Sequence, residues 1–243
     1  MSGTNNPANL TDMNNSATST RMPASDSDLA LFQTIEQQLY TAVICDALDD
    51  LGYRQQAMHQ RIRPLFPNLS FAGWVRTISC VDVSHIPAEP YAKEIEAVDS
   101  ILPGEVVVVS TSYSGENAPW GELLSTAARA RGARGAIVDG LVRDVKKIDQ
   151  LGFPVFAAGI KPVDSRGRGL VIDYNVPVEC GGVMTNPGDL VFADYDGVVI
   201  IPGAVVPEVV RMATDKVSRE NKSRQELIDG AFLRDVYDKY GVL

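Results

Sequence analysis

The sequence predicts one α/β domain built on a sheet of mixed strands, with helices at both ends of the chain. Short apolar runs of strand length alternate with helical patterns over residues 106–157, which is typical of βαβ units. The segment Asp194-Tyr195-Asp196-Gly197 lies between two further apolar runs and indicates an antiparallel hairpin. Apolar residues recur at helical spacing both before and after this region.

Length and composition favour a single folded unit. The 243 residues are enough for one sizeable core, and the 45% share of hydrophobic residues is ordinary for a globular protein. Residues 1–26 are rich in Asn, Ser and Thr and lack an apolar period, so we expect a disordered tail there. One domain is then expected over residues 27–243.

Charge and residue counts argue against several classes of function. The net charge is −9 and no Lys/Arg cluster is present, so we expect no nucleic-acid partner. No apolar run is long enough to cross a bilayer and no secretory signal is recognisable, so we expect a cytoplasmic protein with no membrane partner. Two histidines are too few for a multi-histidine zinc site, and the three cysteines fit free thiols in a reducing compartment.

The first two thirds of the chain carry most of the expected elements. Two helices are expected between Asp28 and Leu51, because Gly52 ends the second apolar pattern. Residues 71–83 have the character of a strand, and residues 90–97 suit a short helix. There follow a turn at 102–105, a strand at 106–109, a loop at 110–119, a helix at 121–131, a strand at 136–139, a helix at 145–151 and a strand at 153–157.

The last third has a different pattern. Residues 205–226 have the apolar spacing of one long helix. Asp194 and Asp196 form a DxD pair, which we interpret as part of a hairpin turn and not as a metal site. Strands are expected at 171–178, 190–193 and 198–201, with a further turn at 186–189.

The helix expected at residues 121–131 offers an anion-binding end. Pro119 suits the first turn, where a missing N–H costs nothing. Free backbone amides at the start of a helix, together with the helix dipole, bind anions such as a carboxylate. The amides concerned belong to Gly121, Glu122, Leu123 and Leu124.

Two charged residues follow the next strand, at the edge where α/β proteins place their ligands. Arg143 can grip a carboxylate through two hydrogen bonds, although an Arg-Asp pair in a loop is commonly a surface ion pair. Asp144 can hold a divalent metal that Glu122 supports through a water, as Mg²⁺ is usually held. Such a metal, chelated by a 2-oxo acid, would stabilise an enolate, which retro-aldol cleavage and oxaloacetate decarboxylation share.

Other reactive side chains lack partners at suitable spacing. We interpret Lys146 and Lys147 as solvated charges and not as Schiff-base lysines. No Walker loop and no GxGxxG after a strand is present. His59 and His85 have no acid or nucleophile near them in sequence, and packing is the expected role of Cys45, Cys80 and Cys180.

The segment GELLSTAARARGARGAIVDGLVRD, residues 121–144, resembles the signature of the RraA-like family. The similarity continues through residues 153–159, 175–202 and the final helix, and it covers roughly residues 42–230. That family contains 4-hydroxy-4-methyl-2-oxoglutarate and 4-carboxy-4-hydroxy-2-oxoadipate aldolases, and also regulators of ribonuclease E. The resemblance implies a swivelling-domain-like α/β/β sandwich with flanking N- and C-terminal helices, assembled as trimers or hexamers.

The resemblance also implies a role for each matching residue. The backbone of residues 121–124 would bind the pyruvyl carboxylate, and Arg143 would bind the substrate and polarise its carbonyl. Asp144 would be the direct metal ligand, and Glu122 would hold a metal-bound water. In the aldolases a glutamate from the C-terminal helix of a neighbouring subunit completes the site, and Glu220 is the matching residue here.

The resulting hypothesis is a class II aldolase that uses Mg²⁺, or else Mn²⁺, to release pyruvate from 4-hydroxy-4-methyl-2-oxoglutarate-like 2-oxo acids. Oxaloacetate decarboxylation is the expected side activity. Two alternatives stay open: a protein-binding regulator of ribonuclease E, and a lyase acting on another 2-oxo acid derived from a sugar acid. The loop at residues 110–119 departs from the aldolase pattern and could set the specificity for the rest of the substrate.

Overall fold

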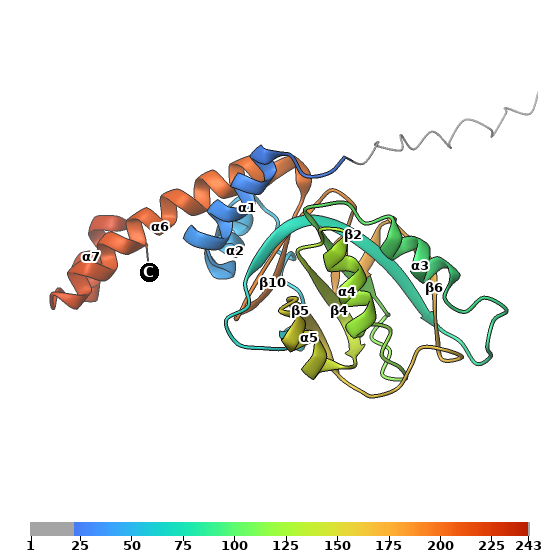
Figure 1. Ribbon diagram of the computed structural model, residues 1–243. Helices are drawn as coiled ribbons and strands as arrows, with labels where there is room; N and C mark the ends of the chain where they lie inside the picture. The colour runs from blue at the N-terminus through green and yellow to red at the C-terminus, as the bar shows by residue number, and fades with distance from the viewer. Residues whose placement is uncertain (1–21, 243) are drawn as a thin grey trace, which may run out of the picture.

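The computed structural model describes residues 22–242 (Figure 1). Most of the expected tail, residues 1–21, lies outside the described residues. The folded part begins before residue 27, earlier than expected, because the Ala24 amide donates to the Pro103 carbonyl oxygen at 2.9 Å. Helix α1 starts at Asp26, where Ser25 and Asp28 form a reciprocal capping box.

The main sheet is mixed, as the sequence predicts. Its strands run in the order β1-β5-β4-β3-β2-β9-β10, with β6 also paired to β2. Strands β2 to β5 are mutually parallel, whereas the other neighbours pair antiparallel. The strands are β1 (Arg63–Pro64), β2 (Phe71–Asp82), β3 (Glu105–Ser110), β4 (Gly135–Val142), β5 (Val155–Ile160), β6 (Gly169–Tyr174), β9 (Leu190–Asp194) and β10 (Gly197–Ile201).

The strand expected at residues 171–178 is wrong as a single element. The chain forms β6, turns at Asn175, and then starts a separate hairpin of β7 (Val178–Cys180) and β8 (Val183–Thr185). Asn175 has a φ of 56°, a left-handed conformation that asparagine tolerates better than most residues. Its amide donates to the Thr77 carbonyl oxygen at 2.9 Å, so the turn stays attached to β2.

Helices cover one face of the sheet and its β9–β10 end. Helices α3 (Ala92–Asp99), α4 (Glu122–Ala130) and α5 (Val145–Leu151) cover the parallel strands, with Trp120, Val138 and Ile148 in the buried cluster between them. Helices α1 (Asp26–Gln38), α2 (Thr41–Asp50) and α6 (Val206–Ile228) pack around Phe192 and Ile201. Helix α7 (Leu233–Tyr240), which the sequence analysis does not predict, folds back beside α6.

The β7–β8 hairpin makes a third layer. It contributes Val178 and Val183 to a buried cluster with Phe156 and Ile137, on the side of the main sheet opposite α4. The arrangement of helices, main sheet and small hairpin is therefore the α/β/β sandwich that the resemblance implies. Among the described helices, none has both the length and the apolar character needed to cross a bilayer.

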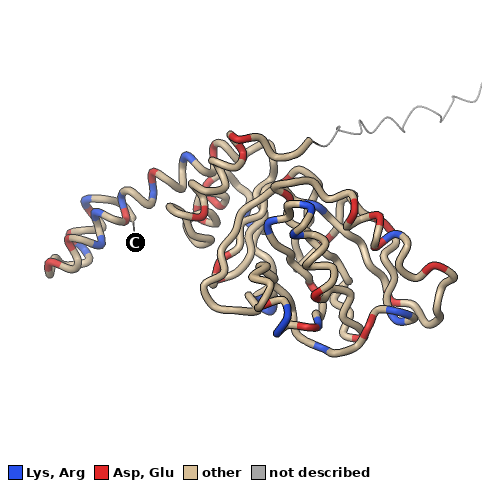
Figure 2. The backbone as a smooth tube through the Cα atoms, viewed as in Figure 1, with Lys and Arg blue, Asp and Glu red and all other residues tan. Residues whose placement is uncertain are grey.

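The C-terminal helices extend away from this sandwich. Figure 1 shows α6 and α7 running outward from the β10 side as an arm, which we call the C-terminal arm (residues 206–240). Lys and Arg alternate with Asp and Glu along it (Figure 2), and pairs such as Arg219–Asp215 and Lys239–Glu226 link them. This mixed pattern differs from the basic stripe of a nucleic-acid-binding helix.

Candidate functional site

A pocket of about 320 Å³ opens between α3, the start of α4 and the loop that follows β4. Arg143 and Asp144 line it together with all four residues of the predicted anion-binding turn, residues 121–124. The structure therefore brings together every predicted site residue except Glu220. Tyr91, Glu94 and Asp164 also line the pocket, and the sequence analysis did not single them out.

The start of α4 is fixed by buried contacts of its own. The Trp120 indole donates to Ser125 Oγ at 2.9 Å, and Ser125 Oγ donates to the Gly121 carbonyl oxygen at 2.9 Å. No side chain caps this end of the helix, so its first amides keep their hydrogen-bonding capacity for a ligand. Because α4 begins beside the pocket, these amides are placed where the predicted anion-binding element would have to be, and that role stays a prediction.

Gly121 lets the loop after β4 approach the helix closely. A Cβ atom at this position would lie 3.0 Å from Asp144 Oδ2 and 3.1 Å from Arg143 Cγ. The Arg143 amide also donates to the Trp120 carbonyl oxygen at 3.0 Å, which joins the two segments. The Asp144 carboxylate therefore sits directly against the N-terminus of α4.

A β-bulge in β4 precedes these residues. The register of β4 against β5 shifts between Val138 and Leu141, and such a bulge redirects the chain at the end of a strand. Gly140 fits here because an added Cβ would lie 2.5 Å from Thr111 Oγ1. The buried Asp139 carboxylate accepts hydrogen bonds from the Thr111 amide at 2.6 Å and hydroxyl at 2.8 Å. These contacts fix the end of β3 to the end of β4 beside the pocket.

Arg143 lies between two carboxylates. Its Nη2 is 3.1 Å from Asp164 Oδ1, and its Nε is 3.8 Å from Asp144 Oδ2. The Tyr91 hydroxyl donates to the other oxygen of Asp164 at 2.6 Å. Burial opposes ionisation of Asp164, but the bond from Tyr91 and the charge of Arg143 hold the pKa of this carboxyl below its ordinary value. Asp164 is therefore an ionised orienting partner for Arg143.

Asp144 adopts a left-handed conformation with φ of 58°. It occupies the position before α5, but its side chain does not cap that helix. Its carboxylate is about half exposed toward the pocket side, at 45% of the side-chain surface. The oxygen atoms therefore remain accessible to a ligand while the backbone is fixed by the turn.

The donor set fits a lightly coordinated divalent cation. Among residues 22–242 no group of three or more His, Cys, Asp or Glu side chains is close enough to form a protein-only metal cage. Asp144 and Glu122 line the same pocket, and Thr126 Oγ1 donates to one Glu122 oxygen at 2.9 Å. Mg²⁺ typically uses one or two carboxylates and keeps several waters, so these residues fit it better than they fit zinc.

Glu94 is the most perturbed acid in the pocket. Burial raises its pKa to about 7, the charge of Asp164 adds to the effect, and Arg143 opposes it. It lies on α3, where no spacing in the sequence pointed to it. Asp164 follows β5, the parallel neighbour of β4, so the rule that ligands gather beyond strand ends was a signal that could have found it.

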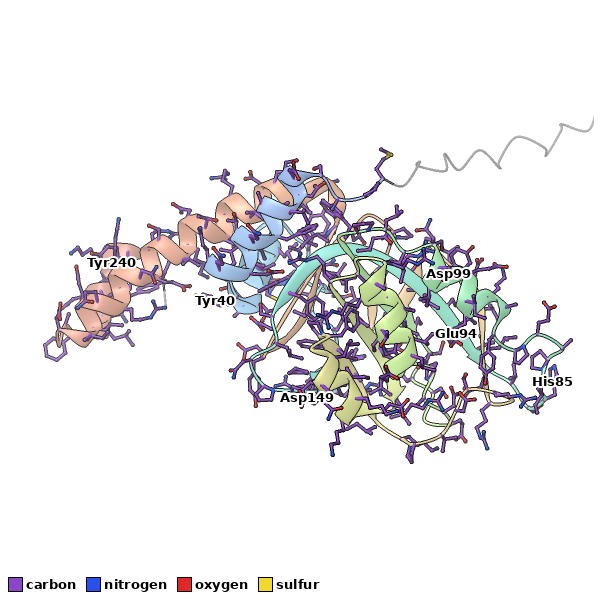
Figure 3. The ribbon with its side chains drawn as sticks, viewed as in Figure 1. Tyr40, His85, Glu94, Asp99, Asp149 and Tyr240 are labelled. Atoms are coloured by element: carbon purple, nitrogen blue, oxygen red, sulfur yellow. The ribbon has the colours of Figure 1, made fainter. Side chains whose placement is uncertain are left out.

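Glu220 lies elsewhere in this chain. It is half-buried on α6, where the Tyr40 hydroxyl donates to its carboxylate, and it lines a second pocket of about 420 Å³ between α2, α6 and α7. Burial raises its pKa, and Arg224 opposes that rise. Figure 3 labels Tyr40 at the base of the C-terminal arm and Glu94 on α3, well apart in this view. A role for Glu220 in a neighbouring subunit's site stays a prediction.

The interpretations of the other candidates fit the structure. Asp194 accepts hydrogen bonds from the Thr41 amide, the Thr41 hydroxyl and the Asp196 amide, so it closes the hairpin and anchors α2. Lys146 and Lys147 are exposed on α5. His59 and His85 do not line the pocket, and Cys45, Cys80 and Cys180 are unpaired thiols, two of them buried.

The chain matches known proteins over much of its length. The sequence model of the RraA-like family, described as Aldolase/RraA, matches residues 41–200. A "Putative 4-hydroxy-4-methyl-2-oxoglutarate aldolase" of Pseudomonas aeruginosa is 34% identical over 173 residues, which are 69% of this chain and 98% of that protein. An uncharacterized protein of Methanocaldococcus jannaschii is 42% identical over 122 residues, 50% of this chain and 58% of that protein.

One solved structure with the same fold comes from Streptomyces coelicolor. It is RraAS2, described as an unusual member of the RNase ES inhibitor RraA protein family. The similarity has a TM-score of 0.74 at 28% identity and covers 84% of this chain and 98% of that one. The proteins that this chain resembles therefore include one named for catalysis and one named for inhibition.

Proposed function

This chain belongs to the RraA-like family, and on that premise we propose that it is a divalent-metal-dependent carbon–carbon lyase that releases pyruvate from 4-hydroxy-2-oxo acids. One observation carries the proposal. The Asp144 carboxylate and the Arg143 side chain lie against the uncapped N-terminus of α4 within a single pocket. A cation ligand, a guanidinium and an anion-binding turn are the three elements needed to hold and activate a 2-oxo acid.

The protein residues have separate tasks in this reaction. The amides of residues 121–124 bind the substrate carboxylate. Arg143 donates a hydrogen bond to the 2-oxo oxygen and stabilises the negative charge that develops there as the C3–C4 bond breaks. Asp164 keeps the Arg143 fork in position through its 3.1 Å contact with Nη2. A divalent cation, Mg²⁺ or Mn²⁺, held by Asp144 and by water on Glu122 would supply Lewis-acid stabilisation of the same charge.

Removal of the proton from the 4-hydroxyl needs a base, and in the proposed enzyme a second copy of the chain supplies it. The C-terminal arm extends away from α3 and α4 (Figure 1), which border the pocket, and its end exposes Ile228, Phe232 and Leu233. Apolar residues exposed together support burial against another subunit. We therefore place the Glu220 of a neighbouring subunit at the distal side of the pocket, in a trimer or hexamer of a cytoplasmic enzyme.

Oxaloacetate decarboxylation is proposed as a side activity of the same site. Loss of carbon dioxide from oxaloacetate and retro-aldol cleavage both leave the enolate of pyruvate, so Arg143 and the α4 amides serve both reactions. A regulator of an RNA-degrading enzyme is the second candidate. The similarity to RraAS2 over 84% of the chain favours it.

Pyruvate chemistry tests the lyase. The metal-supplied protein is expected to release pyruvate from 4-hydroxy-4-methyl-2-oxoglutarate or from oxaloacetate, and to exchange the methyl protons of pyruvate with D₂O. EDTA and Asp144→Asn should each abolish these activities. A folded, metal-supplied protein that catalyses neither release nor exchange would overturn the proposal. Asp144→Asn should leave partner binding unchanged in a regulator.

A further inference from the structure

The charges around the pocket are unevenly distributed. Among the described residues that line it, four are acidic and Arg143 alone is basic. The anion-binding side consists of Arg143 and the start of α4. The opposite side consists of α3 and the loop after β5, which supply Tyr91, Glu94 and Asp164. A substrate that is held by its carboxylate at α4 and crosses the pocket therefore meets acidic and phenolic groups.

The one guanidinium of the lining is already engaged. Arg143 contacts Asp164 at 3.1 Å and lies 3.8 Å from Asp144, and the proposed reaction uses its remaining donors at the 2-oxo oxygen. Arg166 lies near Asp164 in sequence, but its side chain is exposed and outside the pocket lining. Among the described residues that line the pocket there is no second cationic side chain, and the divalent cation proposed at Asp144 and Glu122 belongs to the anion-binding side, so the α3 side has no positive charge of its own to neutralise another carboxylate.

Glu94 is the acid best placed to contact the distal part of a substrate. It lines the pocket on one side and a small apolar void beside Trp120 and Val98 on the other. Across residues 22–242, no hydrogen bond or ion pair engages its carboxylate. A half-buried acid without such a partner is poorly solvated, so a ligand that hydrogen-bonds to it gains the interaction that water cannot fully supply.

A substrate hydroxyl group can hydrogen-bond to the acidic side chains on this side of the pocket more favourably than a substrate carboxylate can. A hydroxyl donates to an ionised Glu94 and accepts from a protonated one, and it can also donate to Asp164. A carboxylate near ionised Glu94 and Asp164 would be repelled in a partly desolvated site. The pKa of Glu94 near 7 means that both of its forms occur at neutral pH, and a hydroxyl suits each.

We propose that the preferred substrates are 4-hydroxy-2-oxo acids whose distal end is uncharged and hydroxylated, and that Glu94 is the residue that selects them over dicarboxylates. This inference rests on the proposed lyase function and narrows its substrate class. The reaction is a balanced retro-aldol cleavage. The C3–C4 bond breaks, its electron pair forms the enolate of pyruvate, the 4-hydroxyl loses its proton to become an aldehyde, and C3 gains a proton.

A matched pair of substrates tests the inference directly. 4,5-Dihydroxy-2-oxopentanoate and 4-hydroxy-2-oxoglutarate differ only in a distal hydroxymethyl or carboxylate group, and both release pyruvate. At pH 8 the wild-type protein with Mg²⁺ is expected to favour the diol by at least about tenfold in kcat/KM. Glu94→Gln, which removes the charge but keeps the shape, should reduce that ratio about tenfold.

The matched control is Glu96→Gln, two positions along α3 on an exposed residue that does not line the pocket. It should leave the ratio at the wild-type value. A wild-type preference for the dicarboxylate, failure to cleave the diol, or an unchanged ratio in a folded Glu94→Gln protein would each overturn the inference. Exchange of pyruvate methyl protons with D₂O involves no distal group, so it separates this failure from a failure of the lyase itself.

Discussion

Arg143 Nη2 lies 3.1 Å from Asp164 Oδ1, and the opposite oxygen of Asp164 accepts a 2.6 Å hydrogen bond from the Tyr91 hydroxyl. The guanidinium is thus positioned by a residue twenty-one places further along the chain, in the loop that follows the next parallel strand, β5. This relationship distinguishes Arg143 from a solvated surface arginine, because its fork is aligned before any ligand enters.

Arg143→Lys should lower kcat/KM for pyruvate release by about 10²–10³-fold, since removing a donor to developing negative charge has an effect of that size. Lysine keeps the charge but loses the planar fork that contacts both Asp164 and the substrate. Steady-state assays of pyruvate release measure the change. Lys146→Ala, on the exposed face of α5, is the control and should be nearly as active as wild type.

Asp144→Asn should abolish metal-dependent turnover and weaken Mn²⁺ binding measured by calorimetry. Asparagine is the chosen replacement because residue 144 has a φ of 58°, which asparagine adopts at least as readily as aspartate. The midpoint of thermal unfolding in EDTA should stay close to that of wild type. Full metal-dependent activity in this variant would contradict the assignment of Asp144 as the ligand.

Loss of the Glu94 proton should lower the free energy of unfolding of the metal-free protein as the pH rises from about 4.5 to about 7. Burial, and then the charge of Asp164, raises its pKa in the folded state from the ordinary 4.5 to about 7, so the folded form binds the extra proton in this window. The stabilisation that comes from this bound proton is fully present below pH 4.5. Linkage limits the loss to about 1.4 kcal/mol per pH unit.

Urea unfolding in EDTA across this pH range measures the effect. Glu94→Gln has no titrating group at this position, so the difference in unfolding free energy between it and wild type should change with pH. Glu96→Gln should follow the wild-type curve. A pH-independent difference between wild type and Glu94→Gln would show that the carboxyl titrates normally.

Glu36→Ala should lower the free energy of unfolding by about 1–3 kcal/mol, because it leaves partly buried donors without an acceptor. One Glu36 oxygen accepts from the Ala72 amide at 2.7 Å and from Arg134 Nη2 at 2.6 Å, which joins α1 to the start of β2. Urea denaturation monitored by tryptophan fluorescence measures the loss. Asp99→Ala, which breaks the exposed pair with Arg131, should have no measurable effect.

Much of the fold could be predicted because its signals are local. Apolar periodicity and glycine stops place α5 at Val145–Leu151, the range in which the structure has it, and they place α4 within one residue at each end. The division of residues 169–180 into β6 and β7 was missed, because it depends on one left-handed residue, Asn175, and on its contact with Thr77. Single-residue conformations of this kind leave no periodic trace.

The candidate site divides in the same way. The residues found from sequence, 121–124 and 143–144, lie in one contiguous segment that contains a helix start and a strand end. Glu94 and Asp164 come from two other segments, and only the packing of α3 and β5 brings them to the same pocket. Whether an acid at such a position is half-buried depends on that packing, which composition and spacing do not encode.

The bond from the Arg143 amide to the Trp120 carbonyl oxygen joins the anion-binding turn to the loop that carries the guanidinium and the Asp144 carboxylate. Because both segments are also anchored in the buried cluster through Trp120 and Val142, neither needs to become ordered when a ligand arrives. The conformational-entropy cost of ordering the pocket is therefore incurred when the chain folds and not when a ligand binds. Binding of a small anion here should consequently show little of the heat-capacity change that accompanies coupled folding and binding.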